Sequence, residues 1–161
     1  MFIHKIVIPG LILVLYACQF PEKEQTNLQT PKALEYDSLL AAEVGADDYG
    51  MRSYVIANLV AGPNRSQDSL EASRLQRAHL DNITRMAEEG TLVLAGPFLD
   101  GQEIRGIYVF AVETIEEAEA LTSTDPAIQA GRLKMELRPW YGSAALMKLK
   151  DLHTQIARKK I

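Results

Sequence analysis

Hydrophobic and polar positions along the chain predict four β-strands after residue 50. Each strand is marked by a run of apolar and β-branched residues, or by strict alternation of apolar and polar ones. Turn-forming Gly, Pro, Asn and Asp residues separate these runs. The strands are expected at residues 52–62, 91–97, 104–112 and 133–138.

A long helix is predicted between the first two strands, at residues 66–89. Gly90 follows it in the position of a helix C′ residue, where glycine is common because it adopts the left-handed conformation easily. One face of this helix is an inward-facing stripe at helical spacing, made of Ala72, Leu75, His79, Ile83 and Met86.

Two capping signals begin further helical segments between the third and fourth strands. Thr114 and Glu117 form a capping box in front of an apolar helix face. Asp125 and Pro126 are the N-cap and first residue of a short helical turn, which Gly131 ends.

The resulting order, β-α-β-β-α-β, is that of the α+β ferredoxin-like fold. In this fold the first and third strands lie in the centre of the sheet, and the predicted strands at 52–62 and 104–112 are apolar on both faces. Because two helices cover only one face of such a sheet, the other apolar face needs a partner. We therefore expect a homodimer whose sheets pack against each other.

Residues 1–18 have the pattern of a bacterial lipoprotein signal peptide. A lysine precedes an apolar run that is too short for a comfortable membrane span and has the length of a signal-peptide core. The run ends at Leu15-Tyr16-Ala17-Cys18, which resembles a lipobox with Cys18 as the acylated residue. Cys18 is the only cysteine and has no disulfide partner within the chain. The alternatives are a plain secretory signal with an incidental cysteine and an uncleaved anchor.

Composition divides the rest of the chain into a polar tether at 19–49, a globular domain at 50–148 and a helical tail at 149–161. The tether is rich in polar residues, with a short helix expected around Ala33–Val44. A lipidated Cys18 would hold the domain at a membrane of the bacterial cell envelope. Gln19, which stands where an aspartate commonly retains lipoproteins at the inner membrane, favours the outer membrane.

The net charge and the absence of known binding motifs limit which classes of ligand and partner are expected. The formal net charge is −4 and no basic face stands out, so nucleic acid is not expected as a partner. No metal-binding motif, phosphate-binding loop, dinucleotide-binding loop or Ser-His-Asp pattern is present. We therefore expect neither a metal nor a cofactor, and a small molecule remains the expected ligand.

His79 is the main candidate for chemistry, because it is the one histidine that lies on an inward-facing stripe. A buried imidazole is either a core histidine satisfied by a backbone carbonyl or a general acid or base. Asp125 likewise has a structural interpretation, as the cap of the turn that Pro126 begins. Arg105 and Arg138 are strand residues that either bind an anionic substrate or face the solvent.

The predicted topology brings two of these candidates into one layer. Both helical segments cover the same face of the sheet, so His79 and Asp125 approach each other from the same side. We predict that their side chains come within hydrogen-bond reach, directly or through one water, beside a small pocket.

Four stretches of the sequence together resemble the YCII-related (YciI-like) domain family. They are Arg77-Ala78-His79-Leu80, the stretch from Glu89 to Phe98, Asp125-Pro126, and the stretch from Glu136 to Trp140. The resemblance spans residues 54–140 and implies a dimeric, ferredoxin-like α/β-barrel fold. It also implies a site in a cleft between helices and sheet, where His79 and Asp125 stand at the motif positions.

Some members and relatives of that family act on small cyclic or aromatic compounds by proton transfer, including dehydrochlorination and isomerisation. The resemblance therefore implies a cofactor-independent lyase or isomerase, in which Asp125 orients the His79 imidazole and stabilises its cation. One alternative is a non-catalytic lipoprotein that binds or senses a small ligand in the same cleft. Another is a purely structural dimeric module.

Overall fold

The computed structural model describes residues 35–159 of the chain. The predicted signal peptide, its Cys18 and the predicted tether as far as residue 34 lie outside the described residues. The compact unit that contains the sheet begins at Tyr36. Its elements are α1 (Ser38–Glu43), β1 (Met51–Ala61), α2 (Ser69–Glu88), β2 (Leu92–Pro97), β3 (Ile104–Phe110), α3 (Ile115–Thr122), α4 (Pro126–Gln129), β4 (Leu133–Ser143), the 3-10 helix η1 (Ala144–Lys148) and α5 (Leu149–Ile156).

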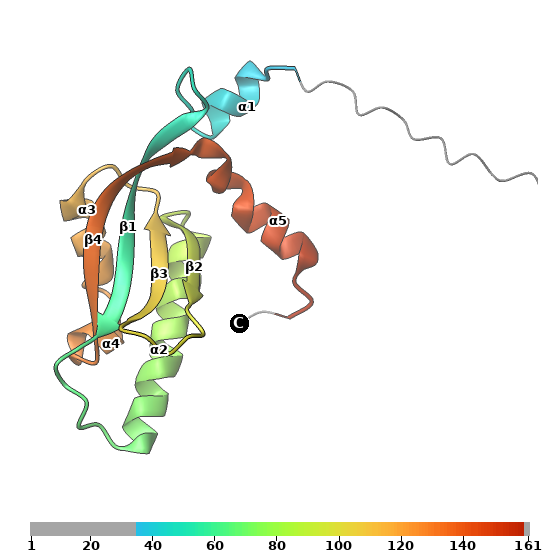
Figure 1. Cartoon of the computed structure of the whole chain (residues 1–161). Coiled ribbons are helices and arrows are strands. Elements are labelled where there is room, and N and C mark those ends of the chain that lie inside the picture. Colours follow the sequence, from blue (N-terminus) through green and yellow to red (C-terminus); the bar gives the residue numbers. More distant parts are fainter. Residues whose placement is uncertain (1–34, 160–161) are drawn as a thin grey trace, which may run out of the picture. The chain divides into compact units, whose positions relative to one another are not determined.

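The four described strands form one antiparallel sheet in the order β2-β3-β1-β4 (Figure 1). β1 and β3 occupy the centre, as their apolar residues on both faces predict. A helix connects β1 to β2, a hairpin connects β2 to β3, and α3 and α4 connect β3 to β4. This is the ferredoxin-like arrangement, so the predicted α+β class and order of elements are confirmed.

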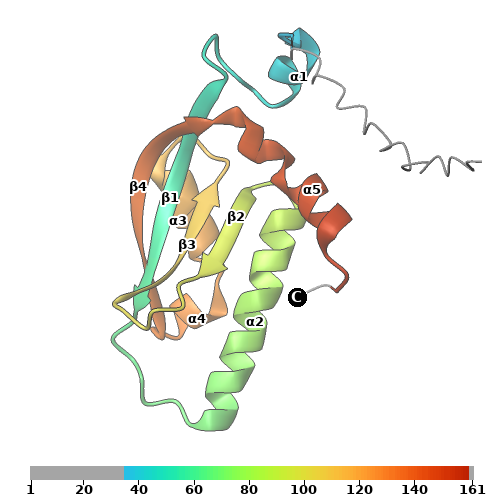
Figure 2. The same cartoon turned by 45° about the vertical axis from the view of Figure 1, so that its right-hand side comes forward.

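Helices α2, α3 and α4 lie on the same side of the sheet in both views of the molecule (Figures 1 and 2). The core sits between these helices and the sheet, because alternate residues of each strand point towards the helices. Its buried residues are Val55, Ala57, Leu59, Met86, Leu92, Tyr108, Phe110 and Ala118.

β4 is longer than the alternating pattern predicts. The strand was expected to end at Arg138, but it continues through Pro139 to Ser143 and pairs with β1 along its whole length. Proline is acceptable here because β4 is an edge strand, and half of the backbone N–H groups of such a strand face away from the sheet. The prediction of the strand end was therefore wrong, and the proline does not terminate it.

The end of β1 makes a close backbone contact with the connection between α4 and β4. The Gly62 amide donates to the carbonyl of Arg132 at 2.9 Å, and the Asn64 amide donates to the carbonyl of Gly131 at 2.9 Å. A Cβ atom on residue 62 would lie 2.2 Å from the Gly131 carbonyl oxygen, so glycine is required there. This contact holds the residues that follow α4 against the end of β1.

The segment before β1 contacts the sheet domain, although its composition assigned it to the tether. Asp37 caps α1 by accepting from the amides of Leu39 and Leu40. Val44 is buried, and its carbonyl accepts a hydrogen bond from the Arg52 guanidinium at 3.0 Å.

The C-terminal segment forms η1 and α5, which agrees with the helix expected in the tail. The Lys150 ammonium donates to the carbonyl of Glu88 at 3.0 Å, and a hollow of about 370 Å³ lies between α5, β2 and α2. Within residues 35–159, no helix is long and apolar enough to cross a membrane.

Candidate functional site

His79 is placed by the amphipathic pattern of α2. The helix begins at the N-cap Asp68, whose carboxylate accepts from the Glu71 amide at 2.8 Å. The buried residues of the helix are Leu75, His79, Asn82 and Met86. His79 is 6% exposed, so its imidazole lies between the helix and the sheet, as its place on the stripe predicts.

Asp125 is placed by the short helix α4. It is the N-cap residue, and its Oδ1 accepts from the Ala127 amide at 2.8 Å, with Pro126 in the first turn. The residue is completely buried. The cap interaction occupies one carboxylate oxygen and leaves the other available to a further donor.

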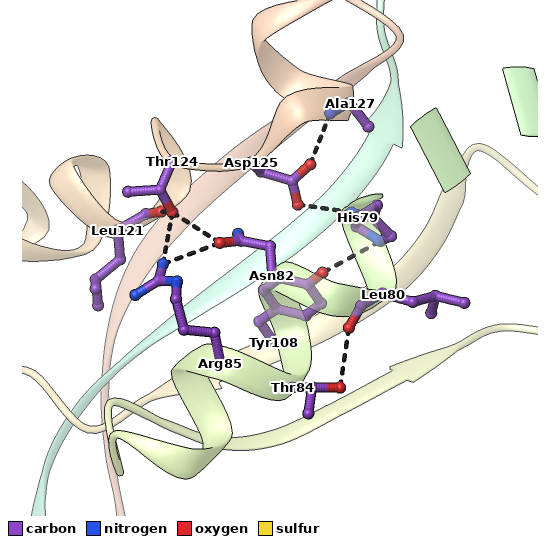
Figure 3. Close-up of polar contacts among 10 residues, drawn as sticks. All are labelled: His79, Leu80, Asn82, Thr84, Arg85, Tyr108, Leu121, Thr124, Asp125 and Ala127. Carbon is purple, nitrogen blue, oxygen red and sulfur yellow. Dashed lines mark hydrogen bonds and ion pairs between the residues drawn. The ribbon is translucent and has the colours of Figure 1, made fainter. Parts of the chain in front are cut away.

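The two side chains meet. His79 Nδ1 lies 2.6 Å from Asp125 Oδ2, within the buried layer between helices and sheet (Figure 3). A carboxylate only accepts, so Nδ1 carries the hydrogen of this bond. The predicted approach of His79 and Asp125 is confirmed, while their catalytic role stays a prediction.

Tyr108 completes a chain of three side chains and was not singled out from the sequence. Its phenol oxygen lies 3.2 Å from His79 Nε2, and the residue is 2% exposed. Burial, and then the negative charge of Asp125, raise the pKa of Tyr108, so the phenol keeps its hydrogen. When the imidazole is neutral and Nδ1 carries its hydrogen, the phenol donates to Nε2. In the sequence, Tyr108 is one apolar residue among several in a buried strand, and nothing there distinguishes it from core.

A second polar cluster lies one helical turn further along α2. Asn82 Oδ1 accepts from Arg85 Nη2 at 2.9 Å, and the hydroxyl of Thr124 lies 3.1 Å from the same oxygen. Arg85 Nη2 also donates to the Thr124 hydroxyl at 3.0 Å. Figure 3 shows Asn82 between Thr124 and the His79–Asp125 pair. Helical spacing with Leu75, His79 and Met86 places Asn82 on the buried side of α2, but nothing in the sequence indicates its contact with Thr124.

The two predicted substrate-binding arginines lie elsewhere. Arg105 is exposed, and its guanidinium donates to the Gly101 carbonyl at 3.1 Å in the β2–β3 hairpin. Arg138 pairs with Ile56, whereas its neighbour Leu137 packs against the core on the helix side. Successive strand residues face opposite sides, so Arg138 lies on the face of the sheet away from His79. Their binding of a substrate stays a prediction, and it is separate from the His79–Asp125 pair.

Three hollows in the described surface have linings that do not include the His79–Asp125 pair or Tyr108. One hollow has a volume of about 430 Å³ and is lined in part by Thr122 and Ile128, each three residues from Asp125. Another has a volume of about 450 Å³ and is lined in part by Leu80, the residue directly after His79. The expected small pocket directly beside His79 is not among these three hollows. With only 6% of its surface exposed, His79 is almost closed off within a single chain.

Residues 35–159 contain no group of three or more His, Cys, Asp and Glu side chains arranged to hold a metal ion. The nearest ionisable partners of His79 are Asp125 and the phenol of Tyr108. The arrangement is therefore suited to moving or holding a proton through hydrogen-bonded side chains.

Comparison with known proteins identifies the family. No curated protein matches the chain. Among solved structures, the chain is similar to 5-chloro-2-hydroxyhydroquinone dehydrochlorinase from Burkholderia phenoliruptrix, which was solved in complex with 2,5-dihydroxybenzoquinone. The two are 17% identical, with a TM-score of 0.41, and the match covers 55% of this chain and 93% of that chain. Residues 59–141, more than half of the chain, match the YCII-related domain, and they include His79, Tyr108 and Asp125. This chain therefore belongs to the YCII-related domain family.

Proposed function

We propose that this chain is a cofactor-independent lyase or isomerase that acts on a small cyclic or aromatic compound by proton transfer through His79 and Asp125. The observation that carries the proposal is the 2.6 Å contact between His79 Nδ1 and the buried Asp125 carboxylate. A carboxylate in this position orients the imidazole and stabilises the imidazolium cation when Nε2 takes a proton.

The proposed step begins at Nε2, the imidazole nitrogen that Asp125 does not hold. Nε2 removes a proton from a carbon of the substrate, and the electron pair of the broken C–H bond stays on the substrate. In a lyase reaction this pair forms a double bond as a leaving group such as chloride departs with its own electron pair. In an isomerase reaction, the imidazolium returns the proton to a different carbon.

The hydrogen bond between the Tyr108 phenol and Nε2 must break for this step, because it occupies Nε2 in the resting state. A substrate whose oxygen hydrogen-bonds to the phenol would draw Tyr108 away from Nε2 and at the same time be held beside the base. The ring of Tyr108 lies nearly parallel to the imidazole, with their planes inclined by 20°. A flat substrate suits such an environment.

A second candidate function is the binding or sensing of a small ligand without catalysis. It is favoured by the same closed geometry, because both imidazole nitrogens already have partners and His79 is almost fully buried. In this alternative the Asp125–His79–Tyr108 chain stabilises the domain, and a ligand binds in a neighbouring hollow.

Turnover and binding measurements separate these two functions. The full chain would be incubated in D₂O with a panel of hydroxylated aromatic rings, chlorinated analogues and cyclic ketones, and chloride release and carbon-bound deuterium would be followed by ion chromatography and NMR. We expect turnover that His79→Gln abolishes and Thr84→Val preserves, since within residues 35–159 the Thr84 hydroxyl bonds only to the Leu80 carbonyl of its own helix. Turnover that survives in His79→Gln would overturn the proposed chemistry, and binding without turnover would favour the sensor.

We also infer a homodimer formed through the face of the sheet opposite the helices. Ile56, Ile107 and Leu94 project from this face, because they lie at positions of β1, β3 and β2 that alternate with the core residues. Leu94 is 37% exposed and Ile107 is half-buried in the single chain. Covering such a face is favourable at about 25 cal/mol per Å² of apolar area.

Analytical ultracentrifugation of the full chain in detergent tests this interface. We expect a dimer that Ile107→Lys converts to a monomer, because a buried lysine without a partner is costly. Leu70→Lys is the matched control, since Leu70 is exposed on α2 and lies outside the sheet. A monomeric unsubstituted chain, or a dimer that tolerates Ile107→Lys, would count against the interface.

The membrane anchor is a further part of the proposal, with a diacylated Cys18 at the mature N-terminus and the domain in the bacterial cell envelope. It is supported by the Leu15-Tyr16-Ala17-Cys18 sequence after an apolar run. Mass spectrometry of the membrane fraction is expected to find the lipid on Cys18, and Cys18→Ser is expected to remove it. A mature chain that starts at another residue and carries no lipid would disprove the anchor.

A further inference from the structure

Asn82 is a buried polar side chain beside the His79–Asp125 pair that the proposed chemistry does not use. It is 8% exposed and lies three residues after His79 on α2. Its oxygen meets Arg85 and the hydroxyl of Thr124, the residue directly before Asp125. The side chain therefore connects the helix that carries the histidine to the segment that carries the aspartate (Figure 3).

Arg85 determines which end of the Asn82 carboxamide faces this connection. A guanidinium only donates, so the atom 2.9 Å from Arg85 Nη2 is the carboxamide oxygen. The same Nη2 donates to the Thr124 hydroxyl at 3.0 Å, and that hydroxyl shares its one hydrogen between the Leu121 carbonyl at 2.7 Å and the Asn82 oxygen at 3.1 Å. Asn82, Arg85 and Thr124 thus form a closed set of contacts between α2 and the end of α3.

The contact between His79 and Asp125 needs such a connection. The two residues come from different elements, and Asp125 lies in the short link between α3 and the four-residue helix α4. The Ala127 amide orients the Asp125 carboxylate but does not hold the link against α2. Among the described residues, the other side-chain hydrogen bonds between α2 and residues 123–126 are those that Asn82 and Arg85 make with Thr124.

The other end of the carboxamide shows that Asn82 is not optimised for stability. Asn82 Nδ2 is buried and has no hydrogen-bond partner within residues 35–159. An unpaired buried amide is unfavourable, and an apolar residue would suit this position of the stripe better. The oxygen end, which makes the defined contacts, therefore accounts for an asparagine at this position.

We propose that Asn82 is a positioning residue for the His79–Asp125 pair. Through Thr124 and Arg85 it holds the α3–α4 link at the distance from α2 that the Nδ1–Oδ2 hydrogen bond requires. Its importance for catalysis rests on the proposed proton-transfer function, but its effect on the hydrogen bond exists without any substrate.

The hydrogen on His79 Nδ1 reports this effect directly by NMR of the ¹⁵N-labelled full chain. Asn82→Leu keeps nearly the same volume and removes the contacts, whereas Asn82→Asp keeps an acceptor for Arg85 and Thr124. We expect Asn82→Leu to accelerate solvent exchange of the Nδ1 hydrogen by about tenfold, the factor that corresponds to the net contribution of one hydrogen bond. Asn82→Asp should retain slow exchange, and Thr84→Val on the same helix should leave it unchanged.

A second variant tests the same connection in case Asn82→Leu does not fold. Thr124→Val is nearly isosteric and breaks the same connection from the other side, so it should also accelerate the exchange. Slow exchange in both folded Asn82→Leu and Thr124→Val would overturn the proposal, as would equal acceleration in Asn82→Leu and Thr84→Val. If the chain turns over no compound but Asn82→Leu still accelerates the exchange, the positioning role stands. Only the proposed catalytic function is then rejected. With a substrate in hand, Asn82→Leu should lower kcat more than it changes KM.

Discussion

The phenol of Tyr108 and the imidazole of His79 are hydrogen-bonded across 3.2 Å, with the Tyr108 oxygen on Nε2 and Asp125 on Nδ1. Burial, and then the charge of Asp125, raise the pKa of Tyr108, so the phenol keeps its hydrogen and can donate it to Nε2 of a neutral imidazole. Because Nδ1 donates to Asp125 and Nε2 accepts from Tyr108, the neutral imidazole has one defined tautomer. This fixed proton arrangement is the basis of the predictions for the site.

Tyr108→Phe should free Nε2 while it preserves the packing of the ring. We expect the ¹⁵N resonance of Nε2 to move towards that of an unbonded acceptor nitrogen, and the free energy of unfolding in urea to fall by about 1 kcal/mol. Tyr54→Phe is the matched control, since it removes another buried phenol, which donates to the Ser143 carbonyl, and should leave the His79 resonances unchanged. Unchanged His79 resonances in Tyr108→Phe would contradict the contact.

Asp125→Ala should be among the most destabilising single substitutions in the domain. It leaves the Ala127 amide and the His79 Nδ1 hydrogen without their acceptor in a fully buried position. We expect a loss of about 2–4 kcal/mol in the free energy of unfolding, measured in urea. Asp68→Ala removes an exposed N-cap of α2 and should cost about 1 kcal/mol. Equal losses in the two variants would show that the burial of Asp125 contributes little.

Alkaline conditions should unfold the domain through its buried tyrosines. Burial is the main cause that raises the pKa values of Tyr108 and Tyr54 above the ordinary value of 10.0. The folded state then binds these protons more tightly than the unfolded state, so stability is fully present below pH 10.0 and decreases above it.

Tyrosinate absorbance and circular dichroism, recorded together, measure this transition. We expect Tyr108 to ionise only as the domain unfolds, and Tyr108→Phe to move alkaline unfolding to higher pH. Reversible ionisation of all six tyrosines of the chain without loss of structure would disagree with this expectation.

Acid should weaken the capping box of α3. The amides of Thr114 and Glu113 donate to the Glu117 carboxylate and lower its pKa from 4.5. The folded state therefore favours the charged form, so this contribution to stability is present above pH 4.5 and is lost as the pH falls through the lowered pKa.

The substitution Glu117→Gln should reduce the dependence of urea unfolding on pH between about pH 7 and about pH 3. Glu116→Gln changes the neighbouring residue of the same helical turn, which is not part of the capping box, and should leave that dependence close to that of the natural chain. Identical pH dependence in Glu117→Gln and the natural chain would exclude the capping box as a source of acid sensitivity.

Local sequence signals predicted the elements that carry the site. The capping box of Thr114 and Glu117 and the N-cap Asp125 with Pro126 are both present, because a cap involves residues only two or three positions apart. His79 faces inward because helical periodicity alone assigns it to the buried stripe. The central positions of β1 and β3 also follow from local pattern, since strands that are apolar on both faces avoid the edge of a sheet.

Residues whose role depends on pairing between distant segments could not be identified in this way. Tyr108 meets His79 because the position of α2 on the sheet places one face of β3 opposite the imidazole. Asn82 meets Thr124 at a sequence separation of 42 residues, which no periodicity encodes. β4 continues past Pro139 because the strand lies at an edge, a property of the whole sheet.

The sequence by itself determined the ferredoxin-like order of elements, the inward direction of His79 and the cap at Asp125, because each depends on neighbours within a few residues. Only the tertiary structure decided that Tyr108 meets His79, that Asn82 meets Thr124 beside the pair and that Arg138 faces away from it. A strand places successive side chains on opposite faces, so a shift of one position in the register of β4 against β1 would exchange the sides of Leu137 and Arg138. That register is set by the packing of the whole sheet against its helices.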